Sequence, residues 1–111
     1  MAAATIPVTV AEDAAARVAA LGMQREFEQM IEHAKQALPG LRAIRVTLEY
    51  DPECPTNPPG VVIWAHRDDS LWKGKLDPAE EDYTSWKIST FPPEVLWHIT
   101  VMPVYGGPDG W

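Results

Sequence analysis

The spacing of the prolines is the strongest constraint on how this chain can fold. No proline occurs between Val10 and Leu38, whereas nine of the eleven prolines follow residue 51. Proline lacks a backbone donor and breaks the interior of a helix, so the long proline-free stretch is suited to an extended helical segment. Pro39-Gly40 then ends that segment sharply. The sequence therefore predicts a helical first part, followed by shorter elements separated by turns.

Residues 10–38 carry apolar side chains at the period of a helix. The residues of this series are Ala16, Ala20, Met23, Phe27, Met30, Ile31, Ala34 and Leu38. Thr9 and Glu12 have the spacing of a capping box, which predicts that the helix begins beside Thr9. Gly22 lowers helix stability by up to about 1 kcal/mol relative to alanine. We therefore expect a bend or break at Gly22, between a short alanine-rich helix and a better anchored one.

Two strands are expected after Gly40. From Arg42 to Tyr50, apolar and polar side chains alternate, which is the pattern of a strand with one buried face. Residues 51–60 contain four prolines and are expected to form a loop. The stretch from Val61 to His66 is apolar up to the histidine, which indicates a second strand buried on both faces.

A second helix and a third strand are expected in the remainder of the chain. Asp77 is placed to cap the helix, and Pro78 suits its first helical position. Phe91-Pro92-Pro93 ends it. Residues 95–104 alternate as a strand. Pro103 cannot donate a backbone hydrogen bond, so the end of this strand is expected at an edge or a bulge.

These elements predict the α+β class with the order α-β-β-α-β. The sheet is expected to be small, three-stranded and mainly antiparallel, with strand 42–50 in the centre and the helices packed on one face. We expect a flexible leader over residues 1–8, a single α+β domain over 9–105 and a flexible C-terminal tail over 106–111. The other face of such a sheet needs more cover than one chain offers, and dimerisation is the simplest source of it.

The charge balance limits the classes of partner. The net charge is −7, with sixteen acidic and nine basic residues and no cluster of lysine or arginine. Such a surface repels phosphate backbones, so we expect no nucleic-acid binding, and a protein partner would be basic. The longest mainly apolar stretch, 95–105, is too short to span a bilayer, so no membrane association is expected. The single cysteine, Cys54, excludes an internal disulfide and is typical of a cytoplasmic protein.

The most reactive side chains gather after the second predicted strand. His66, Asp68 and Asp69 stand close together in the sequence, and His98 could join them beside an aromatic pocket. A histidine near carboxylates can act as a general base, and paired aspartates can hold a divalent ion. A solvated turn at the end of a strand is the simpler interpretation, because no nucleophile or glycine-rich loop is adjacent. We assign no catalytic residue and no cofactor.

Metal binding is not expected from the spacing of the candidate ligands. These ligands are Cys54, His33, His66 and His98, and the closest two, Cys54 and His66, are 12 residues apart. Structural zinc sites usually pair ligands about two to five residues apart within one local element. The sequence therefore predicts no metal site.

All five tryptophans lie in the last 48 residues. Three fall inside predicted elements and are most simply core residues: Trp64, Trp86 and Trp97. Trp72 and Trp111 fall in a loop and in the tail. Tryptophan is favoured at interface hot spots, so Trp72, Trp111 and the neighbouring Leu71 are the expected contacts to a partner. Each tryptophan of this second group could instead fold back on its own domain.

The leading functional hypothesis is a non-enzymatic interaction protein. It would act as a homodimer or as the acidic partner of another protein, in the manner of an antitoxin or an immunity protein. Small size, acidity, excess tryptophan and the lack of assembled catalytic chemistry favour this interpretation. The alternative is a small enzyme or ligand-binding domain that uses the His/Asp group. A structural subunit assembled through the long helix is a third hypothesis.

Overall fold

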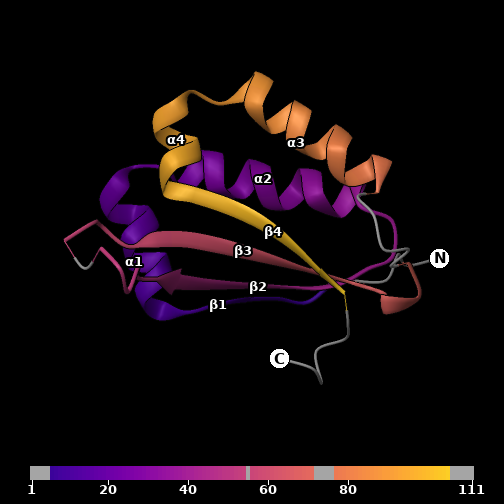
Figure 1. Cartoon of the computed structure of the whole chain (residues 1–111), viewed down its shortest axis with the longest axis horizontal. Coiled ribbons are helices and arrows are strands. Elements are labelled where there is room, and N and C mark those ends of the chain that lie inside the picture. Colours follow the sequence, from indigo (N-terminus) through magenta and orange to yellow (C-terminus); the bar gives the residue numbers. More distant parts are fainter. Residues whose placement is uncertain (1–5, 55, 72–76, 106–111) are drawn as a thin grey trace.

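The computed structural model describes residues 6–54, 56–71 and 77–105. Its elements in chain order are β1 Val8–Val10, α1 Glu12–Leu21, α2 Gln24–Ala37, β2 Leu41–Glu49, β3 Gly60–Arg67, the 3-10 turn η1 Asp69–Leu71, α3 Pro78–Thr90, α4 Pro93–His98 and β4 Ile99–Tyr105. Apart from η1, each half of this order is strand, helix, helix, strand. The two halves meet where β2 returns as β3 (Figure 1).

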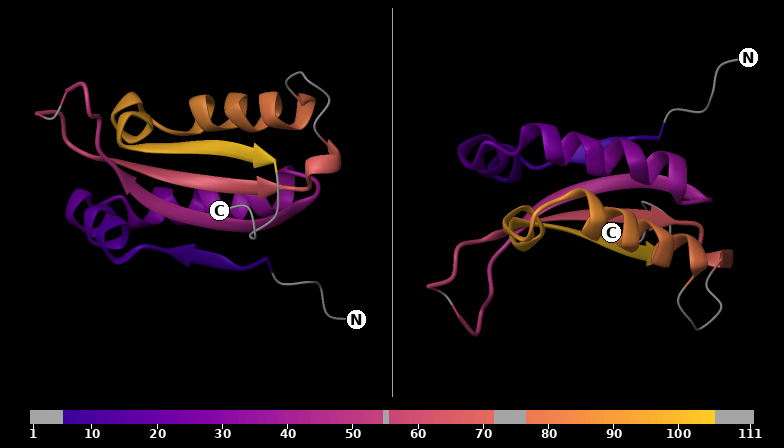
Figure 2. Two further views of the ribbon diagram at one scale, coloured as in Figure 1. Left: turned by 60° about the horizontal axis from the view of Figure 1, so that its bottom comes forward. Right: turned by 90° about the horizontal axis from the view of Figure 1, so that it is seen from above.

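The four strands form one mixed sheet in the order β1-β2-β3-β4 (Figure 2). β2 and β3 are antiparallel, whereas β1 runs parallel to β2 and β4 runs parallel to β3. The predicted α+β class is confirmed, but the three-stranded, mainly antiparallel sheet and the order α-β-β-α-β are wrong. Strand 42–50 was expected alone in the centre. It shares the centre with β3, because β4 pairs with β3 and β1 takes the far side of β2.

The fourth strand is β1, at the start of the described chain. Val8 and Val10 pair with Ile44 and Val46 of β2, and Val8 thus belongs to the sheet although it was expected in the leader. The predicted capping box is also wrong. Thr9 lies in β1, and Ala11 is the N-cap of α1 without a side-chain cap bond. Three consecutive β-branched residues favour a strand once a neighbouring strand supplies hydrogen bonds, and this overrides the local capping pattern.

The predicted break at Gly22 is confirmed. Gly22 adopts φ 69° and ψ 28°, a left-handed conformation that glycine reaches without a steric penalty. Its N–H donates to the carbonyl of Ala19 at 3.1 Å, and the N–H of Met23 donates to that of Val18 at 3.2 Å. These two bonds satisfy carbonyls at the end of α1. The chain can therefore turn at Gly22 and start α2 after a single further residue.

We expect Gly22→Ala to lower the free energy of unfolding by about 1–2 kcal/mol, because an L-residue is strained in the left-handed region. A Cβ at Gly22 meets nothing within 4 Å, so the loss would come from the backbone alone. Gly60→Ala is the matched control, since a Cβ there also meets nothing within 4 Å and the φ of Gly60 is not positive. Urea unfolding of both variants measures the difference. Equal stabilities would contradict a conformational role for Gly22.

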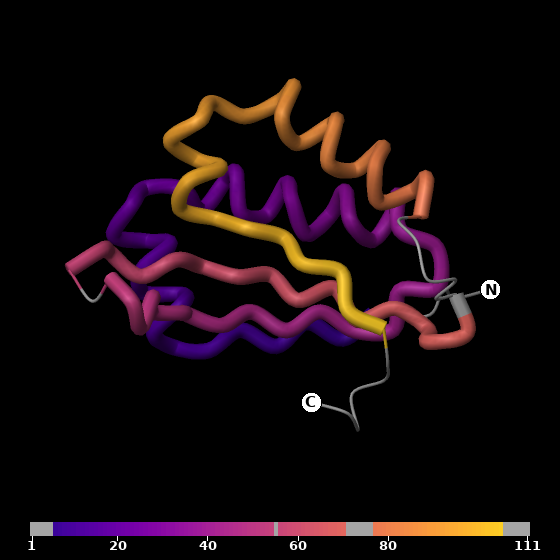
Figure 3. The backbone as a smooth tube through the Cα atoms, in the orientation of Figure 1, coloured from indigo at the N-terminus to yellow at the C-terminus, as the bar shows by residue number. Residues whose placement is uncertain are grey.

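The hydrophobic core lies between the helices and one face of the sheet. Along β2 and β3 the inward side chains alternate, so Ile44 lies opposite Ala65 and Val46 lies opposite Ile63. These four side chains are fully buried. The helices complete this core with Ala14, Val18, Phe27, Met30, Ile31, Ala34, Tyr83 and Val95. All four helices therefore pack on the same face of the sheet, and the chain path in Figure 3 follows this arrangement.

The segment expected to begin the third strand is helical instead. α4 spans Pro93–His98, and β4 starts only at Ile99. Pro93 occupies the first turn of α4, a position that suits its fixed φ and its missing N–H. Because side chains of a helix do not alternate, Val95 is buried while Trp97 is 74% exposed. The prediction that Trp97 belongs to the core is therefore wrong.

β4 is an edge strand, which agrees with the presence of Pro103 within it.

α3 stands beside α2. The Tyr83 hydroxyl donates to the Met30 carbonyl at 2.7 Å, and the Trp86 indole stacks on His33 with ring centroids 3.7 Å apart. Burial raises the pKa of Tyr83, so this hydroxyl stays protonated as a donor. Among the described helices, none is long and apolar enough to cross a membrane.

Candidate functional site

The structure does not bring all the predicted pocket residues together. His66 lies near the end of β3, where it pairs with Val104 of β4. His98 ends α4 and immediately precedes Ile99, which pairs with Val61 at the start of β3. Five residues of strand separate Val61 from His66, which corresponds to about 17 Å. His98 therefore lies toward the opposite end of the sheet from His66.

The two aspartates follow His66 at the end of the strand. Asp68 comes directly after β3, and Asp69 begins η1. The carboxylate of Asp68 accepts the N–H of Ser70 at 3.0 Å, and this hydrogen bond lowers the pKa of Asp68. Such a local bond is typical of a turn that follows a strand. Among the residues that the structure describes, no group of three His, Cys, Asp or Glu side chains is placed to hold a metal ion.

His66 itself is buried, with 6% of its surface exposed. Burial lowers the pKa of His66, and the positive charge of Arg45 lowers it further. The imidazole is therefore neutral near pH 7. A neutral, buried histidine on a sheet packs against its neighbours and does not present a charge to a ligand.

The expected partner contacts are Trp72, Trp111 and Leu71. Trp72 and Trp111 lie outside the described residues. Leu71 ends η1, and its side chain is likewise outside the described part. Their role as contacts stays a prediction.

The face of the sheet opposite the helices is a larger candidate site than the group of His66, Asp68 and Asp69. Its positions alternate with the core positions of β2, β3 and β4, and they are Ala43, Arg45, Thr47, Glu49, Val62, Trp64, His66, Thr100, Met102 and Val104. We call these ten residues the open face, because no described helix packs on it. β3 was expected to be buried on both faces. Val62 and Trp64 are instead only half-buried, because they belong to the open face.

Two side chains dominate the middle of the open face. Trp64 on β3 lies opposite Met102 on β4, and Met102 is 44% exposed. The indole N–H of Trp64 donates to Thr47 Oγ1 on β2 at 2.8 Å. Since this hydrogen bond satisfies the only polar group of the indole, the ring can contact another surface without leaving a buried donor unsatisfied. Trp64 was expected in the core, and the structure places it on this second face.

Charge is distributed unevenly between the two sides of the molecule. The open face has one basic side chain, Arg45, and one acidic side chain, Glu49, with His66 neutral. The four helices carry nine of the sixteen acidic residues. The open face is therefore close to neutral in a protein whose net charge is −7.

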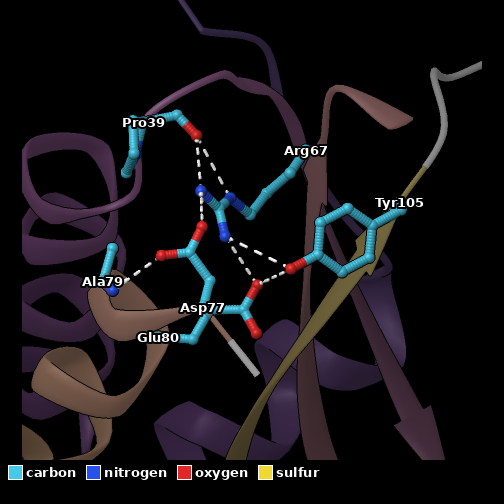
Figure 4. Close-up of polar contacts among 6 residues, drawn as sticks. All are labelled: Pro39, Arg67, Asp77, Ala79, Glu80 and Tyr105. Carbon is cyan, nitrogen blue, oxygen red and sulfur yellow. Dashed lines mark hydrogen bonds and ion pairs between the residues drawn. The ribbon is translucent and has the colours of Figure 1, made fainter. Parts of the chain in front are cut away.

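A buried polar network lies at the end of β3 (Figure 4). Arg67 is fully buried, and its Nη1 donates to Glu80 Oε2 at 2.6 Å. Its Nη2 donates to Asp77 Oδ2 at 3.2 Å and to the Pro39 carbonyl at 2.9 Å, and its Nε donates to the same carbonyl at 3.1 Å. The Tyr105 hydroxyl donates to Glu80 Oε2. The network thus joins β3, β4, α3 and the turn after α2.

The charges of this network stabilise one another. Burial opposes the charge of Arg67, but its hydrogen bonds to Glu80 and Asp77 outweigh this and raise the pKa of Arg67. Burial and the hydrogen bond to Glu80 raise the pKa of Tyr105, so its hydroxyl remains a donor. The sequence contained one indication of this cluster, because His66 and Arg67 are polar residues at the end of an apolar strand. The residues that Arg67 contacts come from distant segments.

Comparisons of the chain with family models, with curated proteins and with solved structures find no match.

Proposed function

We propose that this protein is a non-enzymatic interaction domain that forms a homodimer through its open face. The observation that carries the proposal is the pair formed by Trp64 and Met102, on a sheet face over which no described helix packs. Tryptophan is enriched at interface hot spots, and methionine adapts its shape to a facing surface. Packing two such faces together would bury both side chains.

The charge distribution favours contact through the sheets. Two copies that met through their helices would bring two acidic surfaces together, which is unfavourable. Two open faces are nearly neutral, and each offers one Arg45 and one Glu49. In a two-fold arrangement the same patch meets itself, so Arg45 of one copy can lie near Glu49 of the other. This complementarity supports a sheet-to-sheet homodimer.

The open face is small, which is typical of weak, transient interfaces. Three strands about 4.8 Å apart and about eight residues long at about 3.3 Å per residue give a footprint of about 14 by 26 Å. This area belongs to the small end of specific interfaces. We therefore expect a dissociation constant on the order of 10 µM, so the dimer would exchange with the monomer.

Sedimentation velocity over about 1–200 µM tests the proposal, because this range brackets the expected affinity. We expect wild type to shift from monomer to dimer, and Met102→Glu to remain a monomer because two like charges would face each other. Ile88→Glu is the matched control. Ile88 is 62% exposed on α3, on the helical side of the molecule, and its replacement should leave the dimer intact.

Thermal unfolding of both variants verifies that each is folded, since Met102 and Ile88 are both exposed in the monomer. A wild-type protein that stays monomeric up to about 200 µM would overturn the proposal, as would equal behaviour of the two glutamate variants.

A hetero-partner is the second candidate function, and the acidic helical side favours it. A basic protein could bind the helices, as the net charge of −7 permits. The exposed free thiol of Cys54 fits a reducing, cytoplasmic setting for such a complex. Native mass spectrometry of protein purified from its own cells tests this role. The mass of a second chain would support it, and a monomer or homodimer alone would contradict it.

A further inference from the structure

The outer edge of β4 can be described residue by residue from the alternation of backbone groups along the sheet. Ile44 and Val46 of β2 bond to the residues just before and after β1, so they face β1 and the alternate residues of β2 face β3. By the same alternation, Ile63 of β3 directs its backbone groups to the residues of β4 that flank its partner Val101. Val101 and Pro103 therefore direct their own backbone groups away from the sheet.

Val101 is the position at which another strand could exchange two hydrogen bonds with this edge. The outward N–H of Ile99 already donates to the Val95 carbonyl at the end of α4, and Pro103 has no N–H. Val101 has both an N–H and a carbonyl, and among the described residues none bonds to these outward groups. An antiparallel strand added here would therefore be centred on Val101, with further bonds to the outward carbonyls of Ile99 and Pro103.

A small pocket lies beside Val101, between β4 and α3. Its volume is about 110 Å³, and its lining residues are Leu38, Glu80, Tyr83, Thr84, Val101 and Pro103. The pocket exists because α3 is held against α2, through the hydrogen bond from Tyr83 to Met30, and does not lie flat on β4. Val101 and Pro103 remain half-buried although their side chains lie on the helical side of the sheet. Since both residues belong to the edge and to the pocket, the two features form one docking site.

The position and size of the pocket determine which side chain can enter it. A residue paired with Val101 places its side chain on the same side of the sheet as Val101, which is the side of the pocket. The volume lies somewhat below the roughly 150 Å³ of a cavity that holds benzene, so a group of about four carbons fits, as in leucine. An acidic side chain is excluded, because Glu80 at the pocket is an anion paired with Arg67.

The charge beside the pocket favours a basic residue next to this leucine. Tyr105 at the end of β4 bonds to Glu80 near the start of α3, so α3 and β4 run in opposite directions (Figure 1). A strand antiparallel to β4 therefore runs in the same direction as α3. Glu81 is exposed one turn before Thr84, so a residue that precedes the leucine lies toward this carboxylate. A lysine two residues before the leucine is complementary to it.

We propose that the outer edge of β4 binds an extended segment of a partner protein, which adds as an antiparallel strand and places a leucine in the pocket between α3 and β4. In this mode of recognition the main-chain hydrogen bonds supply affinity and the side-chain pocket supplies specificity. The site lies on the helical side and at the edge of the sheet. A homodimer formed through the open face leaves it accessible, so the two proposals can fail separately.

Titration of the ¹⁵N-labelled full chain with the peptide acetyl-Thr-Lys-Thr-Leu-Thr-Thr-amide, followed by NMR, tests the proposal. We expect saturable amide shifts centred on Thr84 and Val101, with a dissociation constant on the order of 1 mM or below. We also expect slower hydrogen exchange of the Val101 N–H in the complex, because this group becomes hydrogen-bonded. An absence of saturable shifts at about 5 mM peptide would overturn the proposal.

Two altered peptides separate the contribution of the pocket from that of the edge. Alanine in place of leucine leaves the pocket unfilled, and we expect it to weaken binding by about tenfold or more. N-methylation of the leucine removes the N–H that the Val101 carbonyl would accept, and we expect a similar loss. Unchanged affinity of the alanine peptide would exclude the pocket as the anchor. Unchanged affinity of the N-methylated peptide would exclude strand addition, and either result would overturn the proposal.

Variants of the protein locate the site. Thr84→Phe fills the pocket from an exposed position on α3 and should abolish binding, whereas Ser85→Phe at the next exposed position, which does not line the pocket, should leave it unchanged. Met102→Glu should bind the peptide like wild type, because this side chain lies on the open face. Equal binding by the two phenylalanine variants would overturn the proposal. Protection of the Val101 N–H on raising the protein concentration alone would also overturn it, since this would assign the edge to a second copy.

Discussion

Arg67→Ala is expected to lower the free energy of unfolding by about 3–5 kcal/mol, because it removes the positive charge from a buried network and leaves its partners in place. Glu80 and Asp77 would then lose the positive charge of Arg67, and the Pro39 carbonyl would lose the two donors that Arg67 supplies. Solvent does not compensate for this loss, because the side chain of Arg67 is fully buried. Urea unfolding followed by circular dichroism measures the change.

A surface ion pair provides the control for this substitution. Lys35 Nζ and Glu32 Oε2 lie 3.0 Å apart on α2. The side chain of Lys35 is partly exposed and that of Glu32 is largely exposed. Lys35→Ala should change the stability by no more than about 0.5 kcal/mol, because exposed pairs one helical turn apart contribute little. If both variants lost the same small amount, the Arg67 network would not hold the sheet to α3.

Ile63→Ala is expected to lower the free energy of unfolding by about 2–5 kcal/mol, because it leaves a cavity in a close-packed core. Ile63 is fully buried in the middle of β3, where it pairs with Val46 on one side and Val101 on the other. The backbone of both neighbouring strands prevents the site from collapsing around the smaller side chain. The same urea unfolding assay gives the value.

Ile88→Ala is the matched control, since the same atoms are removed from a side chain that is 62% exposed. We expect its stability to lie within about 0.5 kcal/mol of wild type. A comparable loss in both variants would mean that the core is not centred on β3.

Local chemistry made part of this fold predictable from the sequence. Asp77 was expected to cap a helix that begins at Pro78, and its Oδ1 accepts the N–H of Ala79 at 2.8 Å. The alternation from Arg42 to Tyr50 corresponds closely to β2, and Gly22 interrupts the first helical segment as expected. Each of these signals acts within a few residues of the structure that it determines, so no distant partner is needed to interpret it.

The elements that were missed depend on distant partners. Val8–Val10 forms a strand only because the edge of β2 receives it, and a stretch of three residues has no period to detect. Pro93–His98 contains Val95 and Trp97, which suit a strand. The proline at the start of this short segment and its packing on β3 and β4 determine a helix instead. Short elements of this kind are decided by tertiary contacts.

The sites were predictable only in part, for the same reason. His66, Asp68 and Asp69 are neighbours in sequence, but the strand directions separate them from His98. Arg67 donates hydrogen bonds to Asp77, Glu80, Pro39 and Tyr105, which lie 10, 13, 28 and 38 residues away along the chain. The sequence did indicate that one face of the sheet needs cover. The residues that form that face could be identified only from the register of β2, β3 and β4 in the structure.

The central hairpin has a consequence for how this chain reaches its native state. β2 and β3 are joined by residues 50–59, so their pairing closes a short loop and can form early. β1 and β4 run parallel to their neighbours, and each can dock only after two helices have carried the chain back along the sheet. Folding would therefore proceed from the middle of the sheet outwards. In the native protein, transient opening would begin at β1, which has three residues and a single neighbour.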